Sequence, residues 1–348
     1  MSEGKEVSIK DVAQKAGVSP TTVSRVINKS DHPVNAKTAE RVKEVIDRLN
    51  YEPNRMAQGL KKNKSRIIGV IVHDISDSYF SEMVKGIEAI TFGNNYIVNI
   101  CNTERDVQKE INSVKMLKAN RAEAVILAGG NLLDSKYSEE MKELIPQLKK
   151  QGCCVLGVTD HPFDIVNIEL GNERAGFDIT EYLINRGHKN IAFIDGPPIL
   201  QTTRQRFRGF KQALKEYSIT WNSDWIFPGD FTFEGGRKAA YMLEKYASEI
   251  TAVVASNDEA ALGLMWQLKQ NGFKVPEDFS VTGIGNISSS RYSDPPLTTV
   301  DLPLYRLGKS IGNYILQVLQ DGDPHPLNGV DIYLKQRCST TNRRKEDV

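Results

Sequence analysis

The sequence predicts two unlike domains: a small all-α helix-turn-helix domain at the amino terminus and a larger, two-lobed α/β domain after it. In roughly the first fifty positions, apolar residues recur at helical spacing in three short segments separated by cap and turn residues. From Arg66 onward, short apolar runs alternate with longer helical stretches. This alternation is typical of strand–helix–strand units that build a parallel sheet.

The first predicted helix begins after Ser8 and ends at Gly17. Its apolar residues fall at positions i, i+3, i+4 and i+7, which is one face of a helix: Ile9, Val12, Ala13 and Ala16. Ser8 is a suitable N-cap, and Asp11 three residues later completes a pattern like a capping box. Gly17 can adopt the left-handed conformation that terminates a helix.

A second helix follows at once, because Ser19 is a suitable N-cap and Pro20 is tolerated in the first turn. Only Gly17 and Val18 lie between the end of the first helix and this cap, which is helix-turn-helix spacing. Val23, Val26 and Ile27 form its inner face, and its outer face carries Thr21, Thr22, Ser24, Arg25 and Asn28. Arginine can pair with guanine edges, and hydroxyls and amides can bind phosphates. By spacing alone, an ordinary small helical domain remains an alternative.

A third helix is expected after Asn35, with Val42, Val45, Ile46 and Leu49 inside. The segments IKDVAQKAGVS and TVSRVIN, then Tyr51-x-Pro53-Asn54 and Ala57-x-x-Leu60, together resemble the amino-terminal signature of the LacI/GalR family of bacterial repressors. The resemblance implies a DNA-binding domain over residues 1–52 and a hinge helix with linker over residues 53–65. A flexible linker is the alternative for that second segment.

The resemblance also implies a role for each residue of the DNA-reading surface. Arg25 and Thr21 would read bases, while Thr22, Ser24 and Asn28 would hold phosphates. Pro20 would add an apolar contact. Asn54, Ala57 and Leu60 would lie in the hinge, with the leucine wedged into a minor-groove base step. The expected partner is a palindromic double-stranded DNA operator bound by a homodimer.

Composition and charge narrow the class of protein. The 348 residues carry a net charge of only +1, but residues 1–66 hold 14 Lys and Arg against 8 Asp and Glu. A basic head before an acidic remainder favours nucleic-acid binding at one end. No apolar run reaches membrane-spanning length and no signal peptide is evident, so we expect a cytoplasmic, nucleoid-associated protein without membrane contact. The four cysteines show no metal-ligand spacing, and we expect no metal or cofactor.

The alternating region contains two series of strands and helices. The expected strands are 67–72, 96–101, 123–128 and 153–158, then 190–195, 251–255 and 279–284. The expected helices lie near 80–92, 106–119 and 137–150, then near 172–186, 203–217, 234–246 and 257–271. Two such series indicate two lobes with a cleft between them.

The alternating region resembles the periplasmic-binding-protein-like sensor of the same family. That resemblance implies an effector-binding and dimerisation domain over residues 66–340, with three crossings between the lobes. Lobe 1 would comprise about 66–162 and 294–323, and lobe 2 about 163–293 and 324–340. Residues 341–348 would be a polar tail without a leucine heptad, so no tetramer-forming coiled coil is evident.

Ligands in open α/β sheets bind beyond the carboxyl ends of the strands. By resemblance, the effector contacts would be Tyr79, Phe80, Asp160, Thr202, Arg206, Phe231 and Asn257. Aromatic faces can stack on a sugar ring, while Asp, Asn and Arg can bind its hydroxyls. For the aromatic residues the alternative is a place in the core, and for Asp160 or Asn257 a helix cap.

The chain departs from the family pattern at Gly285, where an aspartate is common. Removing a carboxylate from a cleft that keeps Arg206 would raise its positive potential. We therefore hypothesise an acidic or phosphorylated sugar as effector.

The expected function is that of an allosteric regulator, a repressor of carbohydrate-utilisation genes controlled by a small sugar-like effector. The alternative is a cytoplasmic sugar-binding protein, or a sugar-processing enzyme, without DNA regulation. The sequence contains no Walker loop, G-x-S-x-G or H-E-x-x-H motif, so an enzyme is not expected.

Overall fold

The computed structural model describes residues 7–27, 34–51, 65–320, 322, 324–327 and 329–343. The chain divides between Ser65 and Arg66 into two compact units, which we call the head and the body. Each unit is described by itself. The division agrees with the expected start of the second domain at residue 66, while the expected hinge lies outside the described residues apart from Ser65.

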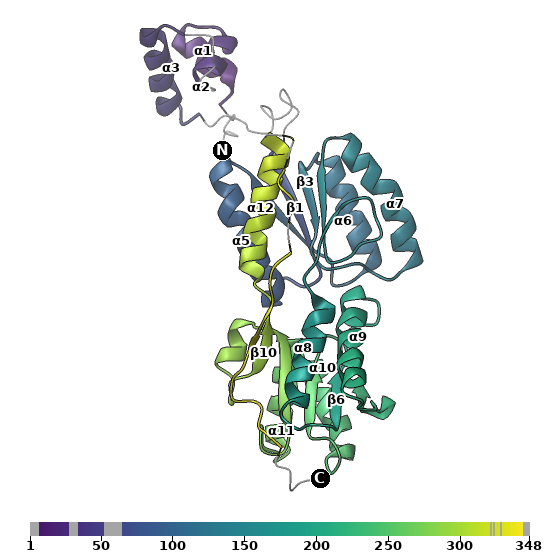
Figure 1. The fold of residues 1–348 in the computed structure, drawn as a ribbon. Helices are drawn as coiled ribbons and strands as arrows, with labels where there is room; N and C mark the ends of the chain where they lie inside the picture. The colour runs from purple at the N-terminus through teal and green to yellow at the C-terminus, as the bar shows by residue number, and fades with distance from the viewer. Residues whose placement is uncertain are drawn as a thin grey trace, which may run out of the picture. The chain divides into compact units, whose positions relative to one another are not determined.

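The head contains three described helices: α1 (Ile9–Ala16), α2 (Pro20–Ile27) and α3 (Ala36–Arg48) (Figure 1). The capping box at the start of α1 is confirmed, because the Asp11 carboxylate accepts hydrogen bonds from Ser8 N at 2.8 Å and from Ser8 Oγ at 2.6 Å. Gly17 ends the helix with a φ of 61°. These two signals place the turn where the sequence predicts it.

The caps of the next two helices are also confirmed. Ser19 Oγ accepts a hydrogen bond from Thr22 N at 3.1 Å at the start of α2, and Asn35 Oδ1 accepts one from Lys37 N at 3.0 Å at the start of α3. The three helices share a small core whose buried members are Val12, Ala13, Ala16, Val23, Val42 and Val45. With so small a core, we expect the head to depend strongly on its caps.

The first lobe of the body is built on a parallel five-stranded sheet in the order β2-β1-β3-β4-β5. The strands are β1 (Ile67–Val72), β2 (Ile97–Asn102), β3 (Ala124–Leu127), β4 (Cys154–Val158) and β5 (Val166–Ile168). One face is covered by α5 (Ser78–Thr91) and α12 (Leu304–Gln320), and the other by α6 (Val107–Ala119) and α7 (Ser135–Lys150) (Figure 1). Burial on both faces explains why the central strands read as continuous apolar runs.

The second lobe is built on a six-stranded sheet in the order β11-β10-β9-β8-β6-β7, in which only the edge strand β11 runs antiparallel to its neighbour. The strands are β6 (Ile191–Ile194), β7 (Ile226–Phe227), β8 (Ala252–Ala255), β9 (Ser280–Gly285), β10 (Thr298–Asp301) and β11 (Tyr333–Lys335). Among the described residues, short 3-10 helices occupy Ser223–Trp225, Glu244–Tyr246 and Ser288–Arg291 of this lobe, and Phe92–Asn94 of the first lobe.

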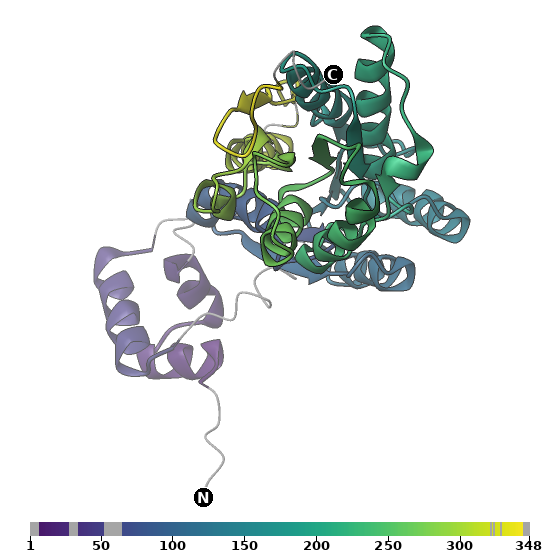
Figure 2. The same cartoon turned by 90° about the horizontal axis from the view of Figure 1, so that it is seen from below.

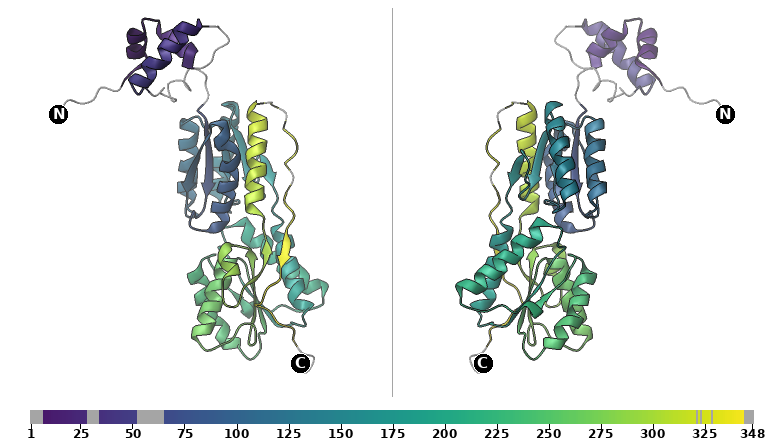
Figure 3. Two further views of the ribbon diagram at one scale, coloured as in Figure 1. Left: turned by 90° about the vertical axis from the view of Figure 1, so that its left-hand side faces the viewer. Right: turned by 90° about the vertical axis from the view of Figure 1, so that its right-hand side faces the viewer.

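Helices again cover both faces of the second sheet, as Figures 2 and 3 show from three sides. The helices α8 (Asn172–Ile184) and α9 (Gln201–Glu216) pack on one face. The helices α10 (Phe233–Leu243) and α11 (Asp258–Gln270) pack on the other. The expected strands and helices of the body are therefore confirmed to within a few residues.

The expected lobe boundaries are wrong in two places. Residues 166–168 form β5, which pairs with β4, so the chain leaves the first sheet after Ile168 rather than at residue 162. Residues 298–301 form β10, which pairs with β9, so the chain returns to the first lobe only after Asp301 rather than at residue 294. Both strands are too short to show a period, and their pairing depends on distant residues. Residues 333–335, within the segment 324–340 expected in the second lobe, form β11 and pair with β10 of that lobe.

Two glycines allow the returning helix α12 to pack closely against α5 of the first lobe. A Cβ on Gly86 of α5 would lie 2.3 Å from Tyr305 O, and a Cβ on Gly308 of α12 would lie 2.1 Å from Met83 O. The two helices therefore approach each other at backbone distance, which only glycine allows at these positions. Among the described residues, no helix is long and apolar enough to cross a membrane.

Candidate functional site

The body encloses a cavity between its lobes, beyond the carboxyl ends of β1, β3 and β9 and at the amino ends of α9 and α11. Six of the seven residues expected to contact an effector line it: Tyr79, Phe80, Thr202, Arg206, Phe231 and Asn257. The space left by the side chains is about 40 Å³, room for about three water molecules. A ring-sized ligand would therefore require the walls to move apart.

A short contact between the lobes closes one side of this cavity. Leu132 of the first lobe and Leu200 of the second form an isolated antiparallel β-bridge. Leu133 N donates to Ile199 O at 2.7 Å, and Gln201 N donates to Asn131 O at 3.2 Å. Both leucines are buried, and Leu200 also lines the cavity. We call this contact the clasp; it holds the start of α9 against the first lobe.

Arg206 is a buried cation in the wall of the cavity. Its side chain is 4 % exposed, and burial lowers the pKa of the guanidinium group. Nε donates to Asn172 Oδ1 at 3.0 Å and Nη1 donates to Ser256 O at 2.6 Å, which fixes the plane of the group. In the described parts of the chain Nη2 has no protein partner. A ligand acceptor could therefore pair with it.

The aromatic side chains form an apolar wall beside Arg206. Tyr79 and Phe80 contact each other edge to face with 4.9 Å between ring centroids, and the Arg206 guanidinium lies 5.7 Å from the centroid of Phe231. Phe231 has a φ of 65°, an unfavourable conformation for a bulky residue. Asn257 Nδ2 donates to Phe231 O at 2.8 Å and so helps to hold it there.

Asn257 has a structural role as well as a place in the cavity wall. Its Oδ1 accepts a hydrogen bond from Ala260 N at 3.1 Å and thereby caps α11. Since Nδ2 holds the backbone of Phe231, both polar atoms already have protein partners. The helix-cap alternative considered from the sequence is thus confirmed for this residue.

The cavity wall contains acidic groups that the hypothesis of an anionic effector did not take into account. Three carboxylates line the cavity, those of Asp77, Asp258 and Glu259, against the cations of Arg105 and Arg206. Burial raises the pKa of Asp77, and the pKa of Glu259 is raised by burial and by the nearby Asp77 and Asp74 carboxylates. The missing aspartate at position 285 therefore does not leave the cleft without acidic groups.

Gly285 has a φ of 142°, a backbone conformation that residues with a side chain rarely adopt. A Cβ at this position would lie 3.6 Å from Asp258 Oδ2, so Asp258 supplies a carboxylate close by. Asp258 is 1 % exposed and accepts hydrogen bonds from Thr299 Oγ1 at 2.5 Å and Ile287 N at 2.9 Å. Burial nevertheless raises its pKa to about 7.

Asp160, the seventh expected contact, does not line this cavity. It is exposed and lines a separate surface pocket with Asn131 and Arg204. The preceding residue explains the difference, because Thr159 is buried with a φ of 74° and its N–H donates to Ile168 O. The chain therefore turns sharply after β4, and Asp160 faces outward.

The cavity also includes residues that the sequence did not single out. Arg105, Leu200, Glu259 and Ile287 line it. Arg105 comes shortly after β2, so the rule of strand ends could have found it. Groups of three or more His, Cys, Asp or Glu residues able to hold a metal ion are absent from the described part of the chain.

The head presents the outer face of α2 as a second candidate surface. Pro20, Thr21 and Arg25 are exposed, and Thr22 and Ser24 are half-buried. The hydroxyl of Thr22 lies 3.0 Å from Ser19 Oγ, so it also supports the helix cap. Four predicted DNA contacts lie outside the described residues: Asn28, Asn54, Ala57 and Leu60.

Comparisons with known proteins match both the head and the body. Residues 8–54 match the family described as bacterial regulatory proteins, lacI family, and residues 180–340 match the periplasmic binding protein-like domain. The chain is 36 % identical over 320 residues to the HTH-type transcriptional repressor PurR of Vibrio vulnificus, covering 90 % of this chain and 92 % of the relative. It is 35 % identical over 313 residues to the repressor CytR of Escherichia coli, covering 90 % of each chain.

Solved structures show the same architecture. A lac repressor dimer bound to operator and the anti-inducer ONPF matches with a TM-score of 0.82 and 28 % identity, over 97 % of this chain and 100 % of that one. A LacI family regulator from Enterococcus faecium with bound ribose matches with a TM-score of 0.69 and 28 % identity, over 80 % of this chain and 100 % of that one. The PurR and CytR relatives are both named transcriptional repressors. The chain therefore belongs to the LacI family of DNA-binding transcriptional regulators.

Proposed function

We propose that the protein is a homodimeric repressor of carbohydrate-utilisation genes that binds a palindromic operator and responds to a small, neutral, hydroxyl-rich ring. Its relatives are named repressors, and one structural relative is described as a dimer bound to operator. The observation that carries the proposal is the enclosed cavity between the lobes, with its aromatic wall and the fixed guanidinium of Arg206.

On the DNA side, α2 enters the major groove and presents Arg25 and Thr21 to base edges. Thr22, Ser24 and Asn28 hold phosphates, and Pro20 adds an apolar contact. Exposure of Pro20, Thr21 and Arg25 supports this assignment. In the proposal the hinge contributes Asn54, Ala57 and Leu60 to the minor groove between the two half-sites.

On the effector side, aromatic rings contact the apolar face of a sugar-like ring, and Arg206 and Thr202 bind its hydroxyls. Three carboxyl groups line the cavity beside its two arginines, which supports testing a neutral effector before an anion. The ribose bound to the Enterococcus faecium relative supports a small sugar as the first class to test. Asp160 has no part in this proposal.

We propose that the clasp couples effector binding in the cavity to movement of the two lobes. Since the space between the side chains is only about 40 Å³, we expect a bound ring to push the walls apart and to strain the clasp that joins the lobes. A ligand that prefers one lobe arrangement shifts the population toward it. In the dimer this shift would change the spacing of the two heads and thereby operator affinity, with a coupling of about 1–3 kcal/mol.

Two measurements test the proposed function. Selection from a pool of palindromic DNA sites should return a specific operator, and absence of any sequence preference would contradict the DNA-binding half. Calorimetric titration with neutral pentoses and hexoses, their acid and phosphate forms, and nucleosides should show tightest binding for a neutral sugar. Tighter binding of an acidic form, or heat of turnover rather than binding, would contradict the effector half.

A further inference from the structure

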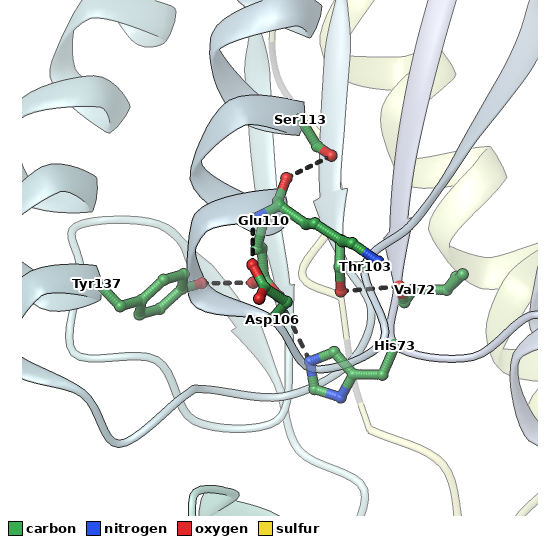
Figure 4. A network of polar contacts seen from close by, with 8 residues as sticks. Val72, His73, Thr103, Asp106, Glu110, Ser113 and Tyr137 are labelled. Atoms are coloured by element: carbon green, nitrogen blue, oxygen red, sulfur yellow. Dashed lines mark hydrogen bonds and ion pairs between the residues drawn. The ribbon is translucent and has the colours of Figure 1, made fainter.

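A buried polar network lies in the first lobe (Figure 4) and reaches the cavity wall at His73. It joins His73 at the end of β1, Glu110 of α6 and Tyr137 of α7, each at most 2 % exposed. Tyr137 OH donates to Glu110 Oε1 at 2.7 Å, and Glu110 Oε2 lies 3.4 Å from His73 Nε2. A buried carboxylate so placed requires an explanation, because burying a charge without partners is costly.

His73 is the residue of this polar network that reaches the cavity. It lines the cavity together with Phe80, whose ring lies edge-on at a centroid distance of 6.0 Å. A Cβ on Gly129 would lie 2.3 Å from His73 Nε2, so the glycine leaves the space that the imidazole fills. The ring is therefore held between the cavity and Glu110.

The two nitrogens of His73 face different surroundings. Nε2 and Glu110 Oε2 are both buried and without a formed hydrogen bond, although they face each other at 3.4 Å. A slight turn of the ring would pair them. Nδ1 lies on the side of the ring away from Glu110 (Figure 4). Nδ1 is therefore the atom available to a ligand.

Tyr137 and Glu110 together determine which nitrogen of His73 carries the imidazole proton. Burial and the Glu110 charge raise the pKa of Tyr137 well above its ordinary value, so the tyrosine keeps its proton and donates it to the carboxylate. An ionised carboxylate can only accept, which requires a proton on His73 Nε2. The hydrogen bond at one imidazole nitrogen fixes the role of the other.

We propose that Glu110 and Tyr137 are positioning residues that hold His73 in its Nε2–H form, so that Nδ1 presents a hydrogen-bond acceptor to the effector. The effector must then place a hydroxyl or N–H donor opposite His73 and not an ether or carbonyl oxygen. This inference rests on the proposed role of the cavity as the effector site, and it adds one element of specificity to that site.

Two other buried histidines serve as internal references. His161 Nδ1 lies 3.2 Å from Thr159 O, a carbonyl that can only accept, so His161 carries its proton on Nδ1. Burial lowers the pKa of His161, which keeps it neutral. His188 Nε2 lies 3.1 Å from Thr341 O, so His188 carries its proton on Nε2. The protein therefore contains one reference histidine in the Nδ1–H form and one in the Nε2–H form.

The test is a long-range ¹H–¹⁵N correlation spectrum of the full chain labelled with ¹⁵N-histidine, at about pH 8 and without effector. The chain has five histidines, and loss of one signal set in a His73→Asn variant assigns His73. The expected pattern for His73 matches that of His188 and differs from that of His161. A His73 pattern that matches His161 would overturn the proposal, because it would place the proton on Nδ1 and a protonated carboxyl on Glu110.

A matched pair of variants separates positioning from packing. In Glu110→Gln the amide can donate as well as accept, so we expect His73 to show a mixture of both forms. In Tyr137→Phe the carboxylate remains, so we expect the Nε2–H form to persist. An unchanged His73 pattern in Glu110→Gln would overturn the positioning role. Since no effector or DNA is present, this outcome is independent of whether the proposed repressor function holds.

Discussion

The head and the body present their polar side chains in opposite ways. In the head, the described side chains that would contact DNA lie on the outside of one eight-residue helix, close together in sequence and mostly exposed. In the body, the polar groups of the cavity come from segments between residues 73 and 287 and are mostly buried. Exposed groups can be removed at little cost to stability, whereas removal of a buried group leaves its partners unpaired.

The largest expected effect follows from removing the buried cation of the cavity. Arg206→Met keeps the length of the side chain but removes the donors to Asn172 Oδ1, Ser256 O and the effector. We expect effector affinity to fall about 10- to 100-fold, the equivalent of about 1.5–3 kcal/mol for hydrogen bonds from a charged group. Calorimetric titration with the effector found in the panel measures it.

Arg208 provides the matched control, because it lies on the same helix and forms an exposed ion pair with Glu173. Arg208→Met should change neither effector affinity nor stability by more than about 0.5 kcal/mol. An equal loss of effector affinity in Arg206→Met and Arg208→Met would contradict the expected difference between buried and exposed groups.

The next effect concerns the pH dependence of the body. Burial raises the pKa of Asp258 to about 7, above the value of about 3.9 for an unfolded aspartate. Its contribution to stability is therefore complete below about pH 4 and is lost as the pH rises through 7. Relative to Asp258→Asn, the wild type should lose on the order of 2–3 kcal/mol of unfolding free energy between pH 5 and pH 8.

Urea unfolding followed by tryptophan fluorescence measures this difference for the body alone, because all three tryptophans of the chain lie beyond residue 66. The experiment is a set of unfolding curves for both proteins across that pH range. Parallel pH profiles for the wild type and Asp258→Asn would show that Asp258 does not titrate with a raised pKa.

A third prediction concerns the exposed face of α2. Arg25→Ala should reduce specific operator binding by about 1–3 kcal/mol and relax base discrimination at one position of each half-site. Its effect on stability should stay within about 0.5 kcal/mol because the side chain is exposed. Competition binding with single-base variants of the selected operator measures both quantities.

Arg48→Ala removes the same charge from the exposed end of α3 and serves as the control. It should weaken binding to all sequences alike, without altering discrimination. If both variants leave discrimination unchanged, Arg25 does not read bases.

The smallest predicted effect concerns the cap of α2. Ser19→Ala removes the acceptor for Thr22 N and should destabilise α2 by about 1 kcal/mol. Faster amide hydrogen exchange over residues 20–27 in the full chain would report it, with exchange in the body unchanged. Ser19→Asp keeps an acceptor and should restore the protection; failure to do so would indicate that the hydroxyl acts otherwise than as a cap.

The sequence predicted local structure well because its signals are local. The caps at Ser8, Ser19 and Asn35 and the stop at Gly17 each depend on residues within one turn, and all four are confirmed. The buried strands of the body were likewise recognisable as continuous apolar runs. The resemblance to a known family then brought together six cavity residues that no periodicity could connect.

The errors have non-local causes. The strands β5 and β10 are defined by their partners in the sheet, so the sequence alone misplaced both lobe boundaries. Asp160 faces outward because of one positive φ at Thr159. The inference of an anionic effector considered Arg206 and Gly285 without Asp77 and Glu259, which reach the same cavity from other segments.

The central claim is that a ligand bound in the body controls DNA binding by the head. Fluorescence anisotropy with the selected operator, measured with and without the effector for wild type and Arg206→Met, tests it most directly. The account predicts that the effector changes operator affinity of the wild type by about 5- to 150-fold. It predicts that Arg206→Met binds the operator as well as the wild type but requires a higher effector concentration. Operator affinity that stays constant while calorimetry shows the effector bound would contradict the account.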